Sequence, residues 1–133
     1  MKAVFVGRFQ PFHKGHLHAI EAAREQFGDV TVVVGSAQKY GTAVNPLPVG
    51  QRIEAIKREL PDVRIVTQND VFNDREWVRQ IQEKVNFDVA VTGNDWVRDC
   101  FRKFGHSVEE PEFLSPEKYN GTAIRKRKLD ENP

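Results

Sequence analysis

Short β-branched runs alternate with helical segments, and this alternation constrains the fold more than any other feature of the chain. The apolar runs are Ala3–Val6, Val30–Val34, Val63–Val66 and Val89–Val91. They are short and nearly unbroken, which is typical of strands that are covered by other elements on both faces. Strands of this kind, separated by helices, predict a parallel sheet joined by right-handed crossovers.

Apolar residues at helical spacing lie between and after these runs. They predict helices over His16–Phe27, Gln51–Leu60, Arg75–Val85 and Asp95–Phe104, with a last short helix from near Thr122. Gly28 and Gly105 are placed to end two of them. The fold class expected is α/β: one Rossmann-like, doubly wound domain over residues 1–133 with helices on both faces and a frayed tail at 130–133. The polar segment Ser36–Val49 predicts a long functional loop.

Charge and composition argue against several classes of protein. Lys and Arg number 20 against 19 Asp and Glu, a net charge of +1, whereas a general nucleic-acid binder usually carries a basic excess. No apolar run approaches the ~20 residues of a membrane span. The N-terminus resembles a strand rather than a signal peptide, and the lone Cys100 excludes an internal disulfide. We therefore expect a cytoplasmic protein without nucleic-acid or membrane partners.

The turn at residues 7–16, Gly-Arg-Phe-Gln-Pro-Phe-His-Lys-Gly-His, follows the first apolar run directly. It brings Arg8 and Lys14 to the start of a helix, where free N–H groups and the helix dipole attract anions. His13 and His16, three residues apart, share one face of the first helical turn. Gly15 lets a base or phosphate approach the backbone. The pattern predicts a polyphosphate site, although the histidines could instead be surface residues of a helix start.

The familiar phosphate and metal fingerprints are missing. The chain has neither the P-loop pattern nor G-x-G-x-x-G, and the histidines lack the i, i+4 spacing with an adjacent acid of a zinc-binding helix. A second anion site is predicted at Thr122, a possible N-cap, with Arg125 one turn later on the same face. The alternative is a solvated basic helix end. A triphosphate could be held between the two helix starts.

Residues 7–16 and 119–125 together resemble the HxGH nucleotidyltransferase superfamily, and the extended turn looks most like its archaeal-type nicotinamide-nucleotide adenylyltransferases. Other stretches fit in the same order: 35–38, 45–46 with 50–53, and 92–94 with 97–98. The resemblance thus covers nearly the whole chain. It departs from the family pattern at Asn120, where serine is usual, and in the longer spacing from Asn73 to Trp77.

The resemblance implies a role for each matching residue. His13, His16 and Arg125 would contact the ATP phosphates and stabilise the transition state. The ATP-binding residues would be Arg8, Phe9, Lys14, Gly15, Arg52, Gly93, Asn94, Thr122 and Ile124. The nicotinamide mononucleotide side, which Phe9 would border, would comprise Gly7, Ser36, Asn73 and Trp77. Trp77 could stack on the pyridinium ring, because a cationic ring prefers an aromatic face, or could simply belong to the core.

The implied reaction is adenylyl transfer from ATP to nicotinamide mononucleotide, giving NAD and pyrophosphate. Mg²⁺ or another divalent cation would bridge the phosphates, with no metal ligand from the protein itself. The implied partners are these two substrates and further copies of the chain in a homo-oligomer. Two alternatives stay open: a superfamily member with flavin mononucleotide, phosphopantetheine or a phosphorylated alcohol as acceptor, and a non-catalytic nucleotide sensor.

Overall fold

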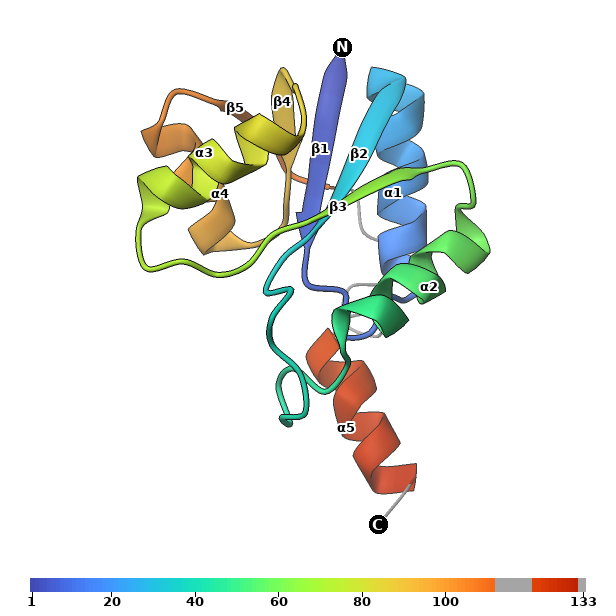
Figure 1. Cartoon of the computed structure of the whole chain (residues 1–133). Helices are drawn as coiled ribbons and strands as arrows, with labels where there is room; N and C mark the ends of the chain where they lie inside the picture. The colour runs from blue at the N-terminus through green and yellow to red at the C-terminus, as the bar shows by residue number, and fades with distance from the viewer. Residues whose placement is uncertain (112–120, 132–133) are drawn as a thin grey trace.

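Strands and helices alternate along the chain in the computed structural model, which describes residues 1–111 and 121–131 (Figure 1). In order, they are β1 (Lys2–Gly7), α1 (Lys14–Phe27), β2 (Asp29–Val34), α2 (Val49–Glu59), β3 (Arg64–Thr67), α3 (Asp74–Lys84), β4 (Val89–Val91), α4 (Asp95–Lys103), β5 (Ser107–Glu109) and α5 (Gly121–Glu131). The helices predicted from the sequence are all present, with ends that differ by two residues at most.

The strands form a parallel sheet in the order β3-β2-β1-β4-β5, which confirms the predicted doubly wound α/β class. The edge strand β5 was not predicted. Its three residues include one apolar side chain, Val108, so it carries too little hydrophobic signal to stand out from a loop. It pairs with β4 through Val89 and Ser107 and their neighbours.

Helices cover both faces of the sheet, as Figure 1 shows. Ala3 and Phe5 of β1 point to the face covered by α1 and α2, where they pack with Ile20 and Ile56. The alternate residues of β1 point to the face covered by α3 and α4, in a cluster that includes Trp77. Because both faces are buried, the strands need no polar alternation, which explains their continuous apolar runs.

Glycines end two helices where the chain must turn with positive φ. Gly28 has φ of 84° after α1, and Gly105 has φ of 85° after α4. Both positions lie in the backbone region that glycine adopts without steric cost. These two predicted helix ends are confirmed. In the part of the chain that is described, no helix combines the length and the apolarity needed to cross a membrane.

The carboxyl ends of the strands lie at one edge of the sheet, and three further segments gather there. In Figure 1 the loop between β2 and α2, the turn after β1 and the first residues of α5 all lie below the sheet. β1 lies between β2, which follows it through α1, and β4, which the chain reaches from β3 through α3, so the direction in which strands are added reverses at β1. Ligands of doubly wound sheets bind at this switch point.

Candidate functional site

The two histidines of the turn after β1 cap the start of α1 reciprocally. His13 is the N-cap, and its Nδ1 accepts hydrogen bonds from the backbone N–H of Gly15 at 3.1 Å and of His16 at 3.4 Å. In return, His16 Nδ1 accepts from the backbone N–H of His13 at 3.2 Å. An Nδ1 that accepts carries no hydrogen, so each neutral ring has its proton on Nε2. The backbone thereby selects the tautomer.

The ring of His16 is uncharged at neutral pH. Burial, and then the nearby His13, lower its pKa from 6.5 to about 3. The two imidazoles are stacked with their centroids 3.6 Å apart. The buried ring of Phe9 meets His16 edge-on, with centroids 4.8 Å apart. Phe9 therefore packs against His16 from the core. The lack of a side chain at Gly7 leaves room for this ring, because a Cβ atom there would lie 3.1 Å from Phe9 Cζ.

Arg8 lies close enough to the other two predicted phosphate-binding arginines, Arg52 and Arg125, to repel each of them. The charge of Arg8 contributes, after burial, to lowering the pKa of both Arg52 and Arg125. Among the described residues, no carboxylate forms an ion pair with any of the three. Unpaired cations near one another at the carboxyl edge of a sheet form a field that attracts an anion. Lys14 adds a further exposed cation at the start of α1.

Arg52 occupies a different position from the one the sequence suggested. Its side chain is fully buried, and its guanidinium donates to five backbone carbonyls, those of Arg8, Gly35, Ser36, Ala37 and Lys39. It holds the loop after β2 against the turn after β1. Arg52 offers no exposed surface to a phosphate here, so its predicted phosphate contact is not supported by this arrangement.

The start of α5 meets the turn after β1. Arg125 donates from Nη1 to the carbonyl of Gln10 and from Nη2 to Thr122 Oγ1, 3.3 Å away. Gln10 in turn exchanges two hydrogen bonds with the backbone of Leu47 in the long loop. Ile124 is half-buried on the same helix, whereas Asn120 lies outside the described residues. The two predicted anion sites are therefore adjacent.

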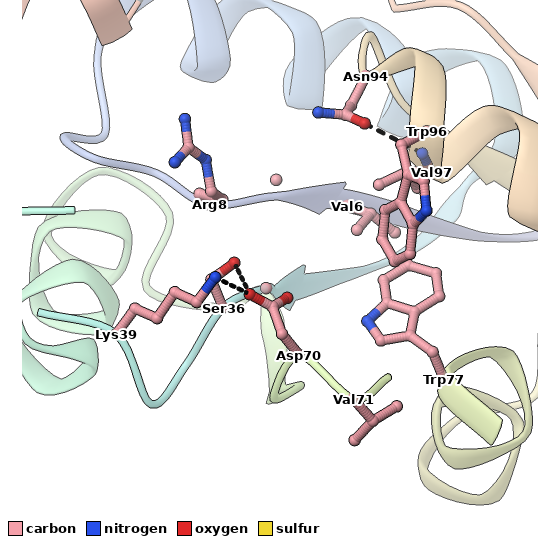
Figure 2. A pocket seen from close by; sticks show the side chains of 12 residues that line it. Val6, Arg8, Ser36, Lys39, Asp70, Val71, Trp77, Asn94, Trp96 and Val97 are labelled. Carbon is pink, nitrogen blue, oxygen red and sulfur yellow. Dashed lines mark hydrogen bonds and ion pairs between the residues drawn. The ribbon is translucent and has the colours of Figure 1, made fainter. Parts of the chain in front are cut away.

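A pocket of about 400 Å³ opens between the ends of β1, β2, β3 and β4 (Figure 2). Its predicted members are Gly7, Arg8, Ser36, Trp77 and Asn94; it is also lined by Val6, Gly35, Lys39, Asp70, Val71, Trp96 and Val97. In Figure 2 Trp77, Trp96 and Val97 lie on one side of the pocket and Arg8, Ser36 and Lys39 on the other, with Asn94 beside Trp96. This composition suits a flat aromatic ring with a polar substituent.

Two asparagines predicted at the site act as helix caps. Asn94 Oδ1 accepts from the backbone N–H of Val97, and Asn94 lines the pocket directly after Gly93. Asn73 Oδ1 accepts from the backbone N–H of Glu76, and Asn73 borders a separate hollow beside α4. The structure thus brings Asn94 to the pocket but not Asn73.

Asp70 is a pocket residue that the sequence reasoning missed. Its Oδ2 accepts from Ser36 Oγ at 2.8 Å and pairs with Lys39 Nζ at 2.9 Å. Gln38 holds the backbone of Asp70 through a pair of hydrogen bonds of 2.9 Å and 3.0 Å. The available signal was a polar residue soon after a predicted strand, and only contacts from the neighbouring loop distinguish Asp70 from Asn69.

Two tryptophans form the apolar wall. Trp77 is 2% exposed and packs edge-on against Trp96 and Phe101, with centroids 5.0 Å and 5.5 Å away. Its Nε1 is buried without a hydrogen-bond partner, an arrangement that costs about 1–3 kcal/mol unless an acceptor arrives. Trp77 therefore belongs to the core and also lines the pocket, so the two interpretations of it from sequence are compatible.

Cys100 offers no nucleophile. It is buried in α4, and this burial, followed by the nearby carboxylate of Asp74, raises the pKa of its thiol to about 11. A thiol with so high a pKa carries almost no thiolate at neutral pH.

Comparisons with known proteins agree with this geometry. The model of the cytidylyltransferase-like family matches residues 4–127. The chain is 40% identical over 133 residues to a nicotinamide-nucleotide adenylyltransferase from Ignicoccus hospitalis, covering 94% of this chain and 78% of that protein. The enzyme of the same name from Sulfurisphaera tokodaii is 38% identical over 140 residues, covering 99% and 81%.

Solved structures share the fold. A bifunctional NMN adenylyltransferase/ADP ribose pyrophosphatase from Francisella tularensis superposes with a TM-score of 0.78 at 24% identity, over 97% of this chain and 42% of that one. This chain thus spans less than half of the bifunctional protein. The family match and the relatives nevertheless cover nearly all of the sequence described above. The chain therefore belongs to the cytidylyltransferase-like family and, within it, to the nicotinamide-nucleotide adenylyltransferases.

Proposed function

We propose that this protein transfers the adenylyl group of ATP to the 5′-phosphate of nicotinamide mononucleotide, giving NAD and pyrophosphate. The observation that carries the proposal is the turn after β1, which lines a tryptophan-walled pocket with Gly7 and Arg8 and then leads to the histidine-capped start of α1. The identity to the archaeal adenylyltransferases supports the same reaction. A phosphate acceptor in the pocket would face a triphosphate bound at the helix start.

The chemistry needs no general base. An oxygen of the mononucleotide phosphate, already an anion, attacks the α-phosphorus of ATP; the bond from that phosphorus to the bridging oxygen breaks, and pyrophosphate leaves. Catalysis then depends on alignment and on stabilising the charge that gathers on the phosphoryl oxygens. The Nε2–H groups of His13 and His16, held by the capping bonds, would donate to these oxygens.

The cations would bind the phosphates. Arg8 and Arg125 repel one another, and an anion between them would relieve that repulsion. Thr122 Oγ1 lies beside Arg125 and could add a donor, as could Lys14. The remaining ATP contacts proposed are with the adenosine, along Gly15, Gly93, Asn94 and Ile124. Gly7, Ser36 and Trp77 would surround the nicotinamide mononucleotide.

A divalent cation would enter with ATP. Within residues 1–111 and 121–131, no group of three His, Cys, Asp or Glu side chains is arranged to hold a metal ion. The side chains around the proposed phosphate site are instead cations and neutral donors. A bound Mg²⁺ would supply charge neutralisation on the phosphates, held by their oxygens and by water. We expect EDTA to abolish turnover and added Mg²⁺ to restore it, as measured by pyrophosphate release.

The direct test is product formation with ATP and Mg²⁺ across a panel of acceptors, separated by chromatography. Nicotinamide mononucleotide should yield NAD and pyrophosphate, and His16→Ala should lower turnover by ~10²-fold or more. Product from flavin mononucleotide or phosphopantetheine alone would refute the acceptor. ATP binding without product from any acceptor would indicate a sensor.

We also propose that the protein works in the cytoplasm as a homo-oligomer. Tyr40 and Phe72 are large apolar side chains that are exposed beside the pocket loops, and such side chains are enriched in subunit interfaces. Sedimentation velocity tests the proposed homo-oligomer, because a monomer at micromolar concentration would contradict it.

A further inference from the structure

We propose that Gln10 is a positioning residue, which holds the phosphate-binding cations Arg8 and Arg125 in place through two separate contacts. Its side chain fastens the loop between β2 and α2 to the turn after β1, and its carbonyl anchors Arg125. This inference rests on the proposed function, because it concerns how the cations are set for ATP. Gln10 itself is 2% exposed and is not proposed to touch a substrate.

The side chain of Gln10 pairs with both backbone polar groups of Leu47. Its Oε1 accepts from the N–H of Leu47 at 2.8 Å, and its Nε2 donates to the carbonyl of Leu47 at 2.9 Å. A primary amide carries an acceptor and a donor side by side, so it can pair with one residue as a neighbouring strand would. Burying an amide is costly unless its donor and acceptor are paired. Gln10 therefore fixes Leu47 against the turn.

The fastened loop also reaches Arg8. Arg8 Nη1 donates to the Oδ1 of Asn45, shortly before Leu47 in the loop, at 2.9 Å. Asn45 is itself placed by a local turn, in which its backbone N–H donates to Thr42 Oγ1 at 2.9 Å. An amide oxygen orients a guanidinium without cancelling its charge, whereas a carboxylate would form an ion pair with it. Asn45 thus directs Arg8 and leaves it a cation.

The carbonyl of Gln10 places the second cation. Arg125 Nη1 donates to this carbonyl from α5, whose first residues lie below the sheet with this turn in Figure 1. Space for the contact is tight, because a Cβ atom on Gly121 would lie 2.7 Å from Arg125 Nη1 and 3.5 Å from the carbonyl oxygen of Gln10. The guanidinium therefore folds back over the bare start of α5 to reach this acceptor.

Two neutral acceptors suit a pair of cations that must stay together until an anion binds. Burial, and then the charge of Arg8, lower the pKa of Arg125, so the two guanidinium groups lie close enough to repel one another. Hydrogen bonds to Asn45 and to the Gln10 carbonyl hold them against this repulsion with their charges intact. Gln10 serves both acceptors, one through the loop and one directly. An arrangement fixed in advance reduces the ordering cost when a phosphate binds.

The backbone of the turn depends on the same contacts. Phe9 has φ of 57°, in the left-handed region that residues other than glycine seldom adopt. Such a conformation persists only where the surroundings impose it. The hydrogen bond from Arg52 to the carbonyl of Arg8, at 3.0 Å, fixes the chain before Phe9, and the Gln10 side chain fixes it afterwards. Without the bonds to Leu47 the turn would be free to relax, and the Gln10 carbonyl would move with it.

The test measures the steady-state kinetics of NAD formation with ATP and Mg²⁺. Gln10→Met keeps the length of the side chain and removes the amide, so KM for ATP should rise about five- to tenfold while kcat falls less than about threefold. KM for nicotinamide mononucleotide should stay unchanged. An unchanged KM for ATP would overturn the proposal.

The matched control is Gln68→Met, which removes another buried glutamine amide. Gln68 hydrogen-bonds to Gln80 at 2.7 Å and to Lys84 at 2.8 Å, so its side chain is tied to α3 rather than to the turn after β1. Urea unfolding should show a loss of stability in both variants, but KM for ATP should rise only in Gln10→Met. An equal rise in both would show that lost stability, not positioning, weakens the use of ATP, and would overturn the proposal.

A double-mutant cycle tests the route through the loop. Asn45→Ala should raise KM for ATP about three- to fivefold, and Val44→Ala, at an exposed neighbour, should leave it unchanged. If Gln10 acts through Asn45, the double variant with Gln10→Met should raise KM by less than the product of the two single effects. Fully multiplicative effects would overturn the proposed coupling.

Calorimetric titration with ATP and Mg²⁺ separates this inference from the proposed function. The affinity for ATP should weaken in Gln10→Met by about five- to tenfold, as KM does. If the unaltered protein forms no NAD but Gln10→Met still binds ATP more weakly, the proposed reaction is refuted and the positioning role is kept. If NAD forms and both proteins bind ATP equally, only the positioning role is refuted.

Discussion

His13 has two tasks that substitution can separate, because its Nδ1 caps α1 while its Nε2–H is proposed to donate to a phosphate. His13→Ala removes the acceptor for the N–H groups of Gly15 and His16. Loss of an N-cap costs about 0.5–2 kcal/mol, and the stack on His16 at 3.6 Å is lost as well. We expect destabilisation near the upper part of that range, about 1.5–2 kcal/mol, which corresponds to a fall in Tm of about 5–7 °C for a domain of this size.

His13→Asn should preserve the N-cap of α1 and lower the rate of adenylyl transfer. Asparagine is among the best N-cap residues, since its short amide oxygen reaches the same backbone N–H groups. It places no donor where the imidazole Nε2–H lies. Stability should therefore stay within about 0.5 kcal/mol of the unaltered protein, while kcat falls by about 10²–10³-fold, the usual effect of removing one preorganised donor.

The assay is urea unfolding followed by circular dichroism, paired with the rate of pyrophosphate release for each variant. His18→Ala, an exposed change on the same helix, serves as the control and should alter neither quantity. An unchanged unfolding midpoint in His13→Ala would refute the capping assignment. Full turnover in His13→Asn would remove the His13 ring from the mechanism.

Three further predictions follow from the same geometry. The pKa of His16 is about 3 in the folded protein and about 6.5 in the unfolded chain, so the unfolded state binds a proton first as the pH falls. The contribution of His16 to the free energy of unfolding should therefore be complete above pH 6.5 and decrease toward pH 3. Urea unfolding at each pH measures this decrease, which should be shallower in His16→Asn. Arg52→Met should lower the free energy of unfolding by about 2–4 kcal/mol, because it leaves buried carbonyls without a hydrogen-bond donor. An unchanged midpoint of urea unfolding would show that these hydrogen bonds do not stabilise the fold. Arg8→Ala should raise KM for ATP by about tenfold or more with little loss of stability, and an unaltered KM in steady-state kinetics would exclude it from phosphate binding.

Local patterns predicted most of the fold, since the relevant interactions are local or periodic. The continuous apolar run Ala3–Val6 indicated burial on both faces, and Gly28 marked a helix end that only positive φ allows. β5 was not predicted because an edge strand with one apolar residue shows no apolar periodicity. The spacing of His13 and His16 predicted a shared face correctly, but not that each ring caps the other.

The missed and misplaced site residues have a common physical cause. Arg52 has the chemistry of a phosphate ligand, and only the tertiary fold decides that its guanidinium meets carbonyls instead. Asp70 became a pocket residue through Ser36 and Lys39, which belong to the loop after a different strand. A single sequence records which groups a side chain carries, whereas the partners of these two come from segments 13 to 44 residues away.

In the proposed reaction, the charged arginines would contribute mainly to substrate binding and the neutral His16 mainly to catalysis. In the proposed reaction ATP carries its charge already in the ground state, so the cations Arg8 and Arg125 would attract substrate and transition state to a similar degree. Interactions of that kind lower KM more than they raise kcat. A neutral imidazole would add little to this general attraction, but its fixed Nε2–H would meet the phosphoryl oxygens at one geometry. In the proposed reaction, keeping His16 uncharged, by burial and by the nearby His13, would reserve its contribution for the transition state, where the charge on those oxygens changes.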